Sequence, residues 1–539
     1  MKITITHKIT IISCMVLLLL SCEELDLAPE NQFTDLTYWT SISKAETVLN
    51  TAYSQIQNSN FFFYNEAISD NAYNGRGDIA GAASLGSGTH DASLARFKDE
   101  WNNRYAGIKT CNLLLENIDR ISNTDATIID RIKAEARFLR AFQHFQLMTW
   151  FGDIPLIEKD LTIEEAQTIS RTPREQVLQF ILNELDYVAT VLPTNTEYKE
   201  SDRGRITKGA ALALKARVHL YEGDWQAVVN ECEKLINTTE NGSYELFSSY
   251  EGLFLPQNEY NSEDILSLQY VPEYRTWNEY FDMAPLTAGA RLNAIAATQE
   301  LVDSYLMING KKITDVDSNY DENNPYINRD PRLTYTVVYD GYQWENPEGG
   351  TQTILIKPGS NTADEYVPGS SATPTGYYWR KYFDPTHQSS LSSGLNLMLI
   401  RYADILLMYA EAKNELNSFD KTIWETTIKR LRNRAGFTDP PALNFDASLN
   451  QSDFRLIIRN ERRVELAFEG LRIFDIRRWK TAETVLNGWA HGAKFGPISQ
   501  DDGYIRANLR TFDPNKHYLW PIPRDERLIN TNLSQNPGW

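Results

Sequence analysis

Apolar residues recur every three or four positions through long segments of both halves of the chain, a spacing typical of amphipathic helices. Start signals support two of these segments, because Thr172 precedes Pro173 at a first helical turn and Ser452 precedes Asp453 as a second cap. A mainly α-helical fold is therefore expected. The predicted helices cover residues 43–57, 101–121, 130–151, 173–192, 208–222, 225–236, 402–416, 423–434 and 453–468.

The segment 209–229 predicts a close pair of helices. Small residues line one face of its first helix, a turn at Gly223-Asp-Trp225 follows, and an amphipathic second helix comes after the turn. Alanines at such a face let two helices approach closely, and the arrangement resembles a tetratricopeptide hairpin. Weaker copies of the pattern occur at 134–141 and 403–412. Long segments separate these hairpins, so a plain solenoid is not expected.

Residues 237–395 follow a different pattern, with loops, short alternating stretches and many aromatic side chains. Alternation over 333–339 predicts a strand, whereas 359–376 is too irregular for a helix or strand. Long irregular segments usually carry function or are disordered, and disordered segments are poor in aromatic residues. We therefore expect these loops to be functional or packed. No Gly/Ser linker divides the chain, which predicts one integrated globular unit.

The first residues have the pattern of a bacterial lipoprotein signal. Lys2 and Lys8 flank a polar start, and residues 9–20 form an apolar run that is too short to span a bilayer as a helix. The run ends in Leu19-Leu-Ser-Cys22, which resembles a lipobox, the motif whose cysteine takes the lipid. A multiply acylated cysteine holds a protein stably at a membrane. The sequence therefore predicts a signal peptide over 1–21 and lipidation of Cys22.

Charge narrows the set of ligands. The chain has 539 residues, with 53 Lys and Arg against 72 Asp and Glu, and a formal net charge of −19. Such acidity argues against nucleic-acid binding and against electrostatic binding to anionic membranes. It also disfavours a strongly anionic ligand, although a local basic patch could override that preference. No second apolar run reaches membrane-spanning length, so the lipid is the expected anchor.

Two cysteines beyond Cys22 lie within helical patterns of apolar residues. Cys111 and Cys232 both occupy positions that a helix would bury, where cysteine acts as a small apolar residue. Neither has the spacing of a metal or redox motif. The sequence is compatible with a disulfide between the two and with two free thiols.

The sequence lacks signals for catalysis. It has no H-E-x-x-H, G-x-S-x-G or phosphate-binding Gly-rich motif, and its seven histidines are scattered. Glu461, Glu465 and Glu469 could pair for glycosidase chemistry, but the interleaved arginines favour a structural ion-pair network. Residues 315–322 alternate oxygen groups as calcium sites do, yet lack the glycine and terminal glutamate of an EF-hand. We therefore expect no cofactor, no metal and no enzymatic activity.

Two stretches have the residue types that bind sugars. A sugar ring presents a weakly polar C–H face and a rim of hydroxyls, so its site needs flat aromatic rings beside amide, carboxylate and guanidinium groups. Residues 60–78 and 274–282 each combine aromatic residues with Asn, Asp or Glu, and Arg. A packed core position is the alternative for every aromatic in both stretches.

A series of short motifs gives the chain a family resemblance. Each motif alone is weak, but their order is specific, and it resembles the SusD/RagB family of nutrient-binding outer-membrane lipoproteins across nearly all of the chain after the signal. The motifs are Leu25-Asp-Leu-Ala-Pro29, Ala134-Glu-Ala-Arg-Phe-Leu-Arg-Ala141, Trp150-Phe-Gly-Asp-Ile-Pro155, Arg329-Asp-Pro-Arg-Leu333, the stretches 399–412 and 458–472, Leu519-Trp-Pro-Ile-Pro523 and Asn536-Pro-Gly-Trp539.

The resemblance implies a mainly α-helical fold of about four tetratricopeptide-like hairpins with irregular loops and a few short strands. It implies an N-terminal region over 22–236 and a C-terminal region over 237–539, loop-rich to 395 and helical over 396–480. It also implies a lipid-anchored protein on the exterior of the outer membrane. The implied partner is a TonB-dependent, SusC-like outer-membrane transporter that takes up the captured glycan.

The resemblance also guides the choice of site residues, because family members often place sugar contacts where the first stretch lies. Two other functions stay open. A peptide-binding or other nutrient-binding protein of the same architecture would ignore sugars, and a surface glycoside hydrolase on a helical scaffold would release products. The predicted ligand-binding residues are Tyr73, Asn74, Arg76, Trp277, Asn278 and Tyr280.

Overall fold

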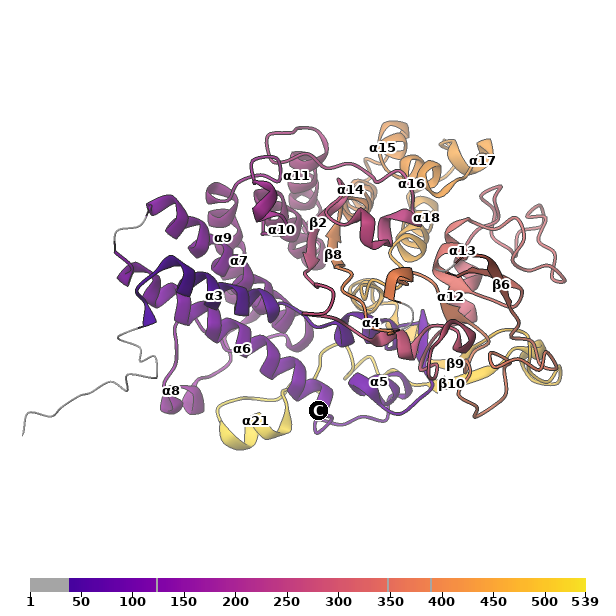
Figure 1. Cartoon of the computed structure of the whole chain (residues 1–539), viewed down its shortest axis with the longest axis horizontal. Coiled ribbons are helices and arrows are strands. Elements are labelled where there is room, and N and C mark those ends of the chain that lie inside the picture. Colours follow the sequence, from indigo (N-terminus) through magenta and orange to yellow (C-terminus); the bar gives the residue numbers. More distant parts are fainter. Residues whose placement is uncertain (1–37, 123–124, 347–348, 388–389) are drawn as a thin grey trace, which may run out of the picture.

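The computed structural model describes residues 38–122, 125–346, 349–387 and 390–539, apart from the side chains at 280, 281 and 387. The predicted signal peptide and Cys22 lie outside these residues. Figure 1 shows helices at one end of the molecule and loops with short strands at the other. Among the described residues, every helix is too short or too polar to cross a membrane.

The chain is mainly α-helical with a few short strands, which confirms the predicted fold class. The helices are α3 (Ile42–Ser54), α4 (Ser59–Ala67), α5 (Ala82–Ser87), α6 (Ala95–Asn117), α7 (Ala126–Phe151), α8 (Ile163–Thr168), α9 (Arg174–Val191), α10 (Lys208–Glu222), α11 (Trp225–Ile236), α12 (Gln299–Ser304), α13 (Arg332–Thr336), α14 (Tyr402–Glu415), α15 (Lys421–Thr426), α16 (Ile428–Ala435), α17 (Pro440–Leu443), α18 (Gln451–Glu465), α19 (Arg472–Arg478), α20 (Ala482–Val485) and α21 (Arg524–Ile529).

The strands pair two by two, and every pairing in the described part of the chain is antiparallel: β1 with β3, β2 with β8, β4 with β7, β5 with β6 and β9 with β10. Most pairs join segments that are far apart in sequence, so they fasten loops to the helical layer. The strands are β1 (Ala72–Asn74), β2 (Asp264–Leu268), β3 (Ile295–Ala297), β4 (Val337–Val338), β5 (Tyr342–Glu345), β6 (Thr351–Ile354), β7 (Tyr378–Trp379), β8 (Leu397–Arg401), β9 (Gly488–His491) and β10 (Arg506–Arg510).

The α10–α11 hairpin has the bounds that its sequence predicts. Thr207 caps α10 by accepting a hydrogen bond from the backbone N–H of Ala210 at 3.0 Å. Gly223 ends the helix with a left-handed φ of 74°, which allows the turn into α11. All the alanines of α10 are buried, so neighbouring helices pack closely against it. α10 contacts α9 and α11, and α11 contacts α14, which extends the helical layer.

Two predicted elements differ from the structure. The strand predicted over 333–339 is wrong for most of its length, because α13 occupies Arg332–Thr336 and only β4 follows it. The buried guanidinium of Arg332 binds Glu461 at 2.7 Å and Glu465 at 2.8 Å, and such long-range contacts override local alternation. The helix predicted over 423–434 is interrupted at Thr427, whose ψ of −88° separates α15 from α16.

A buried ion-pair network occupies the centre of the molecule. Glu461, Glu465 and Glu469 are each at most 5% exposed. Arg332 binds Glu461 at 2.7 Å and Glu465 at 2.8 Å, and Arg401 binds both Glu465 and Glu469 at 2.7 Å. This confirms the interpretation of the three glutamates as a structural network, and it ties α18 to the start of α14.

Cys111 and Cys232 are both buried and free, so the disulfide that the sequence left open is not formed. Burial raises the pKa of the Cys111 thiol to about 12. A thiol with a raised pKa is a poor nucleophile and a poor metal ligand at neutral pH. Both cysteines therefore act as small apolar residues.

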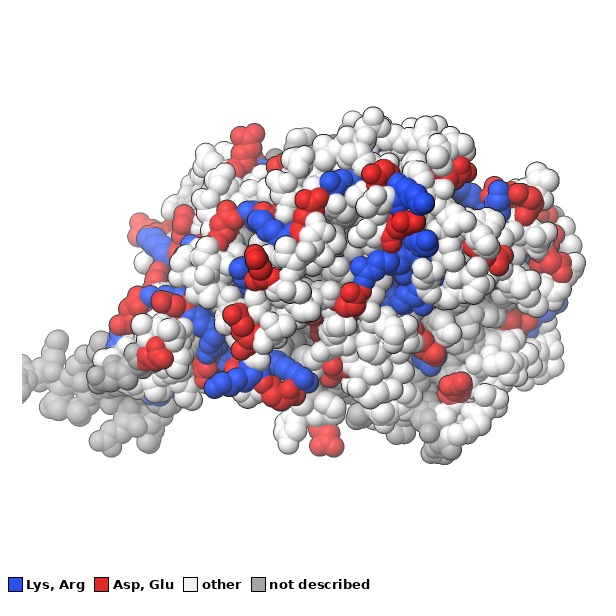
Figure 2. Space-filling model, turned by 90° about the horizontal axis from the view of Figure 1, so that it is seen from above, with Lys and Arg blue, Asp and Glu red and all other residues white. Residues whose placement is uncertain are grey.

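The negative charge is not concentrated on the face that Figure 2 shows. There, Lys and Arg side chains lie among Asp and Glu side chains, and most of the surface belongs to other residues. Apart from a group of Lys and Arg side chains right of centre, charges of both signs are interspersed, so this face presents no extended negative area to a ligand.

Gly88 provides a test of how α5 supports the loop-rich end. It has a left-handed φ of 71°, and a Cβ at this position would lie 2.2 Å from the backbone oxygen of Thr511. We expect Gly88→Ala to lower the free energy of unfolding by about 1–3 kcal/mol, because both the left-handed backbone and the contact oppose a side chain. Urea unfolding followed by circular dichroism measures the change.

Gly77→Ala is the matched control. Its φ of 58° is also positive, but a Cβ there would meet no atom within 4 Å, so only the backbone part of the cost should remain. Equal losses at Gly77 and Gly88 would contradict close packing after α5.

Candidate functional site

An open cavity of about 410 Å³ lies where α12 meets the β9–β10 hairpin, at the loop-rich end of the molecule (Figure 1). α12 supplies three of its side chains, β9 supplies two, and the loop between β9 and β10 supplies two. We call this cavity the hairpin pocket. It is lined by Gln299, Glu300, Asp303, Trp489, His491, Asp501 and Tyr504.

Short strand pairings position the walls of the hairpin pocket. β3 pairs with β1, and Thr298, directly after β3, caps α12 by accepting from the backbone N–H of Leu301 at 3.3 Å. On the other wall, Trp489 of β9 lies opposite Leu509 of β10. Because successive strand residues point to opposite faces, Trp489 and His491 project to the same side. The pocket therefore joins segments that are distant in sequence.

His491 binds a carboxylate with each of its ring nitrogens. Its Nδ1 lies 2.8 Å from Glu300, and its Nε2 lies 3.1 Å from Asp501. The hydrogen bond to Glu300 raises the pKa of His491, and the bond to Asp501 adds to the effect. Asp501 also accepts from Arg506 Nε at 2.6 Å, and Arg506 and His491 together lower the pKa of Asp501. Glu300 and Asp501 are thus already paired with His491, and Asp501 is also paired with Arg506.

Two aromatic rings line the same pocket. Trp489 is 39% exposed, the highest exposure of a tryptophan in the described residues. The guanidinium of Arg506 lies 5.2 Å from its ring, and the ring of Tyr504 lies 6.3 Å from that of His491. Exposed rings beside carboxylate, amide and imidazole groups match the C–H face and hydroxyl rim of a sugar.

The first predicted set lies beside the hairpin pocket without lining it. Asn74 is only 2% exposed, and its Oδ1 accepts a hydrogen bond from the backbone N–H of Arg76 at 3.2 Å. Arg76 is partly exposed and donates from Nη2 to the backbone oxygen of Ala372 at 3.3 Å. Asn74 therefore shapes the turn, whereas Arg76 stays accessible.

Tyr73 has the closest link to the pocket among the predicted residues. It is half-buried, and burial raises the pKa of its hydroxyl. Arg510 donates to the backbone oxygen of Ala72 at 2.7 Å, and its charge acts on both Tyr73 and Glu300. Tyr73 and the hairpin pocket consequently flank one buried arginine.

The second predicted set is divided by burial. Trp277 is 2% exposed and its Nε1 donates to the backbone oxygen of Leu395 at 2.8 Å. It therefore has no ring face to offer a ligand, which corrects the expectation of an exposed platform there. Asn278 is exposed, and the side chain of Tyr280 lies outside the described residues. Among the described side chains of this stretch, Tyr274 is an exposed aromatic residue, at 89%.

Trp489 and Tyr504 are the aromatic residues that sequence reasoning missed. Local signals were weak, because β9 is short and its partner β10 follows a long loop. The alternation of Trp489 and His491 on one side of a segment that begins with Gly488 was the available signal. The two residues lie near α12 because of the tertiary structure, which local sequence patterns do not show.

We expect His491 to titrate above its ordinary pKa of 6.5. A histidine whose pKa is raised in the folded state stabilises the fold below 6.5, and this contribution is lost as the pH rises through the folded-state pKa. An NMR titration of the imidazole protons measures the midpoint. Glu300→Gln removes the strongest contact, so it should move the midpoint down. A wild-type midpoint at or below 6.5 would contradict the described contacts.

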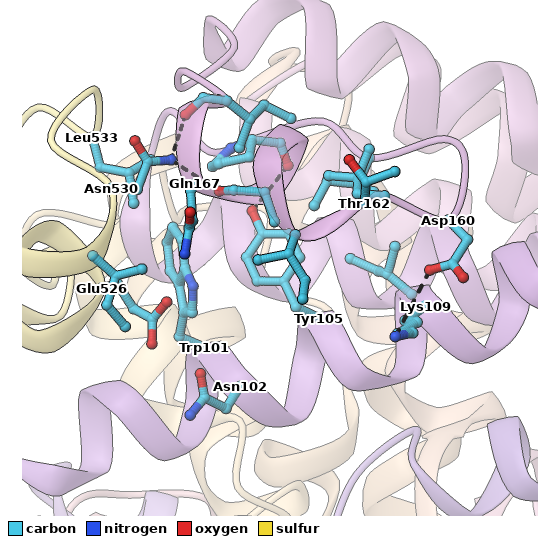
Figure 3. A pocket seen from close by; sticks show the side chains of 18 of the residues that line it. Trp101, Asn102, Tyr105, Lys109, Asp160, Thr162, Gln167, Glu526, Asn530 and Leu533 are labelled. Atoms are coloured by element: carbon cyan, nitrogen blue, oxygen red, sulfur yellow. Dashed lines mark hydrogen bonds and ion pairs between the residues drawn. The ribbon is translucent and has the colours of Figure 1, made fainter.

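A second cavity, of about 510 Å³, lies among α6, α8 and α21 (Figure 3). Trp101 and Tyr105 project into it from α6, and Lys109 lies 3.9 Å from Asp160 at its edge. Much of the remaining lining is aliphatic, and Ile163 is 79% exposed. Such a lining suits apolar groups better than a hydroxyl-rich sugar.

Two family models match the chain. A model described as "SusD family" matches residues 258–539, and one described as "Starch-binding associating with outer membrane" matches residues 25–220. The first match alone covers more than half of the chain and includes every residue of the hairpin pocket.

Known proteins resemble the chain over nearly its full length. SusD-like protein P2 of Formosa agariphila is 26% identical over 99% of both chains. A SusD-like carbohydrate-binding protein of Bacteroides fragilis has a solved structure with a TM-score of 0.83 and 30% identity, covering 92% of this chain and 100% of that one. A laminarin-binding SusD-like protein has a TM-score of 0.68 and 22% identity, covering 93% of this chain and 100% of that one, and it shares the fold.

Proposed function

The chain belongs to the SusD family, and from this premise we propose that it captures oligo- or polysaccharides at the outer membrane and passes them to a TonB-dependent transporter. The ligand docks on the surface around the hairpin pocket, and the chain holds it without breaking it. Cys22 carries the lipid that keeps the protein on the exterior of the membrane.

The exposed ring of Trp489 in the hairpin pocket is the observation that carries the glycan proposal. A sugar stacks its C–H face on this ring, while the carboxylates of Asp303 and Glu300 accept hydrogen bonds from its hydroxyls. Tyr73 and Arg76 extend the surface beyond the pocket. An open cavity of this kind suits one segment of a longer chain.

The charges of the pocket favour capture over cleavage. Glycoside hydrolysis needs one carboxyl group that holds a proton and a second that stays ionised across the sugar. Asp303 is the pocket carboxyl group whose pKa burial raises, and it accepts a hydrogen bond from Gln299 at 2.7 Å. The two carboxylates that would have to act opposite it are both bound to His491, and Asp501 is also held ionised by Arg506. The more central glutamates, Glu465 and Glu469, are buried in ion pairs where no sugar reaches them.

Known relatives support a glycan as the ligand. One family model is described as starch-binding, one similar solved structure is a carbohydrate-binding protein, and another is laminarin-binding. These descriptions name different glycans, so they support the class of ligand and leave its linkage to experiment.

A binding screen tests the proposal. The purified protein without residues 1–22 is run through native gels that contain one of a panel of neutral and acidic polysaccharides, and oligopeptides are titrated in parallel. We expect retardation by at least one polysaccharide, no response to peptides, and no new reducing ends after prolonged incubation. Binding confined to peptides would replace the glycan proposal with the peptide alternative. Sugar release that vanishes in Glu300→Gln would replace capture with hydrolysis.

Cys22→Ala tests the anchor. We expect the variant to leave the outer-membrane fraction when it is expressed without a transporter partner, because a single cysteine carries all the acyl chains in this proposal. Cell fractionation followed by immunoblotting measures the distribution. Cys111→Ala is the matched control, since Cys111 is buried and should keep the wild-type distribution. Retention of Cys22→Ala in the membrane would contradict the assignment.

A further inference from the structure

A cationic cavity of about 670 Å³ lies at the junction of α7, α9, α10, α19 and the C-terminal segment. Five of its lining side chains are basic, whereas Asp153 is the one acidic residue among them. Such an excess is unexpected in a chain with a net charge of −19. It shares no residue with the hairpin pocket. The basic residues of the cavity are Arg171, Arg174, Arg477, Arg478 and Lys480.

Arg477 is buried without a carboxylate partner. It is 7% exposed, its guanidinium lies 4.6 Å from the ring of Trp150, and its Nη2 donates to the backbone oxygen of Tyr518. Its Nη1 has no hydrogen-bond partner among the described residues. Burial lowers the pKa of Arg477 to about 9, which reflects the cost of an uncompensated charge. A buried cation of this kind calls for an anion.

Two further cations in the cavity also lack an acidic partner in the described part of the chain. Arg171 donates only to neutral oxygens, including Asn536 Oδ1 at 2.6 Å and the backbone oxygen of Asp153 at 2.7 Å. Lys480 lies over the ring of Tyr518 at 3.9 Å, and burial and the charge of Arg477 lower the pKa of Lys480. Arg477 and Lys480 therefore repel one another, and in the described residues none of the three cations forms an ion pair with a carboxylate.

The remaining basic residues are already satisfied. Arg174 forms a bidentate pair with Glu222, and Arg478 binds Glu411 at 2.6 Å. The contrast with Arg171, Arg477 and Lys480 shows that the cavity is not a general ion-pair network. The positive charge without an acidic partner belongs to Arg171, Arg477 and Lys480.

We propose that this cavity binds an oxyanion, a sulfate, phosphate or carboxylate group, carried on a molecule of mono- or disaccharide size. Arg477 lines the cavity and its Nη1 is unpaired, and guanidinium groups bind planar or tetrahedral oxyanions with charge-assisted hydrogen bonds. Lys480 adds a mobile positive charge at the mouth.

The size and rings of the cavity suit a ligand larger than a bare ion. Its volume falls within the range of small-molecule sites. Tyr221 and Tyr518 line it and give ring faces for a sugar, while hydrogen bonds within the chain hold the amides of Gln535 and Asn536 in the wall. An acidic sugar would place its anionic group on Arg477 and its ring near the tyrosines.

Isothermal titration of the purified protein with glucose 6-sulfate, glucuronate, glucose and sodium sulfate tests the site at constant ionic strength. We expect the two acidic sugars to bind and glucose to give no heat. Lys480→Glu should weaken the acidic sugars by about tenfold or more, since it reverses an exposed charge at the mouth. If sodium sulfate binds as tightly as glucose 6-sulfate, the oxyanion contacts are supported and the ligand is the inorganic ion.

Controls separate this site from the hairpin pocket and from the fold. Lys199→Glu makes the same charge change at an exposed residue outside the cavity, and it should leave affinity unchanged. Trp489→Ala should also leave acidic-sugar binding unchanged, so failure here is distinct from failure of the proposed function. Equal binding of glucose and glucose 6-sulfate, no binding of any acidic probe, or equal losses in Lys480→Glu and Lys199→Glu would overturn the proposal.

Discussion

Replacing Arg401 with methionine is expected to lower the free energy of unfolding by about 3–5 kcal/mol, the cost of removing one partner from a buried ion pair. Arg401 is 1% exposed, and its Nη1 binds Glu263 at 2.6 Å and Glu465 at 2.7 Å. Its Nη2 binds Glu469 at 2.7 Å. Methionine fills part of the volume but leaves three buried carboxylates short of a counter-charge. Urea denaturation at neutral pH measures the loss.

This loss should shrink in acid. Burial alone would raise the pKa of Glu465, but Arg434, Arg401 and Arg332 together hold it well below its ordinary 4.5. A carboxylate with a lowered pKa stabilises the fold above its ordinary pKa, and the contribution is lost as the pH falls. Without Arg401, Glu465 takes up a proton at a higher pH. Wild type and variant should therefore approach each other in stability below about pH 4.5.

Lys98→Met is the control for a surface ion pair. Lys98 binds Asp525 at 2.8 Å, but the two side chains are 45% and 55% exposed. Solvent screens such a pair, so its loss should cost far less than the loss of Arg401. Comparable losses at Arg401 and Lys98 would show that the buried network does not hold α14 and α18 together.

Trp489→Ala is expected to weaken glycan binding by about 10- to 100-fold, because an exposed tryptophan at the centre of a binding surface typically contributes a large share of the affinity. The ring supplies the flat apolar surface of the hairpin pocket, and no other tryptophan lines it. Isothermal titration with the polysaccharide fragment chosen by the screen measures the change. Unfolding in urea should stay close to wild type, since the side chain is 39% exposed.

Two variants accompany Trp489→Ala. Trp489→Phe keeps a flat ring and should retain most of the affinity. Ile498→Ala removes an apolar side chain that is 84% exposed in the loop between β9 and β10, outside the pocket, so it should have no effect. Equal affinities in wild type and Trp489→Ala would place the sugar elsewhere on the molecule.

Sequence patterns predicted correctly those elements whose structure depends on neighbouring residues. α10 and α11 have their predicted bounds because alanine spacing, the Thr207 cap and Gly223 all act within one hairpin. The ion-pair role of Glu461 and its neighbours was also predictable, since the charges alternate on one helix. The strand predicted at 333–339 failed because Arg332 is drawn into a buried network formed by residues far along the chain.

The candidate site was less predictable than the fold. Residue type favoured Tyr73, Arg76 and Trp277 alike as ligand-binding residues. It could not show that Trp277 is buried and bonded to the backbone of Leu395, whereas Trp489 is exposed. Exposure depends on which segments meet, and the hairpin pocket joins α12 to a hairpin at the other end of the sequence. The sequence also does not show that Arg477 lacks an acidic partner. The adjacent Arg478 has the same sequence context, yet it binds two acidic residues.

Hydrogen–deuterium exchange in the presence of the selected oligosaccharide tests most directly whether the chain captures a glycan at the hairpin pocket. We expect slower exchange in 299–303, 488–491 and 501–506, with smaller protection at 73–76, and an unchanged oligosaccharide at the end of the measurement. Protection confined to other segments, such as 101–109 and 160–169 around the apolar cavity, would contradict it, as would the appearance of cleaved sugar.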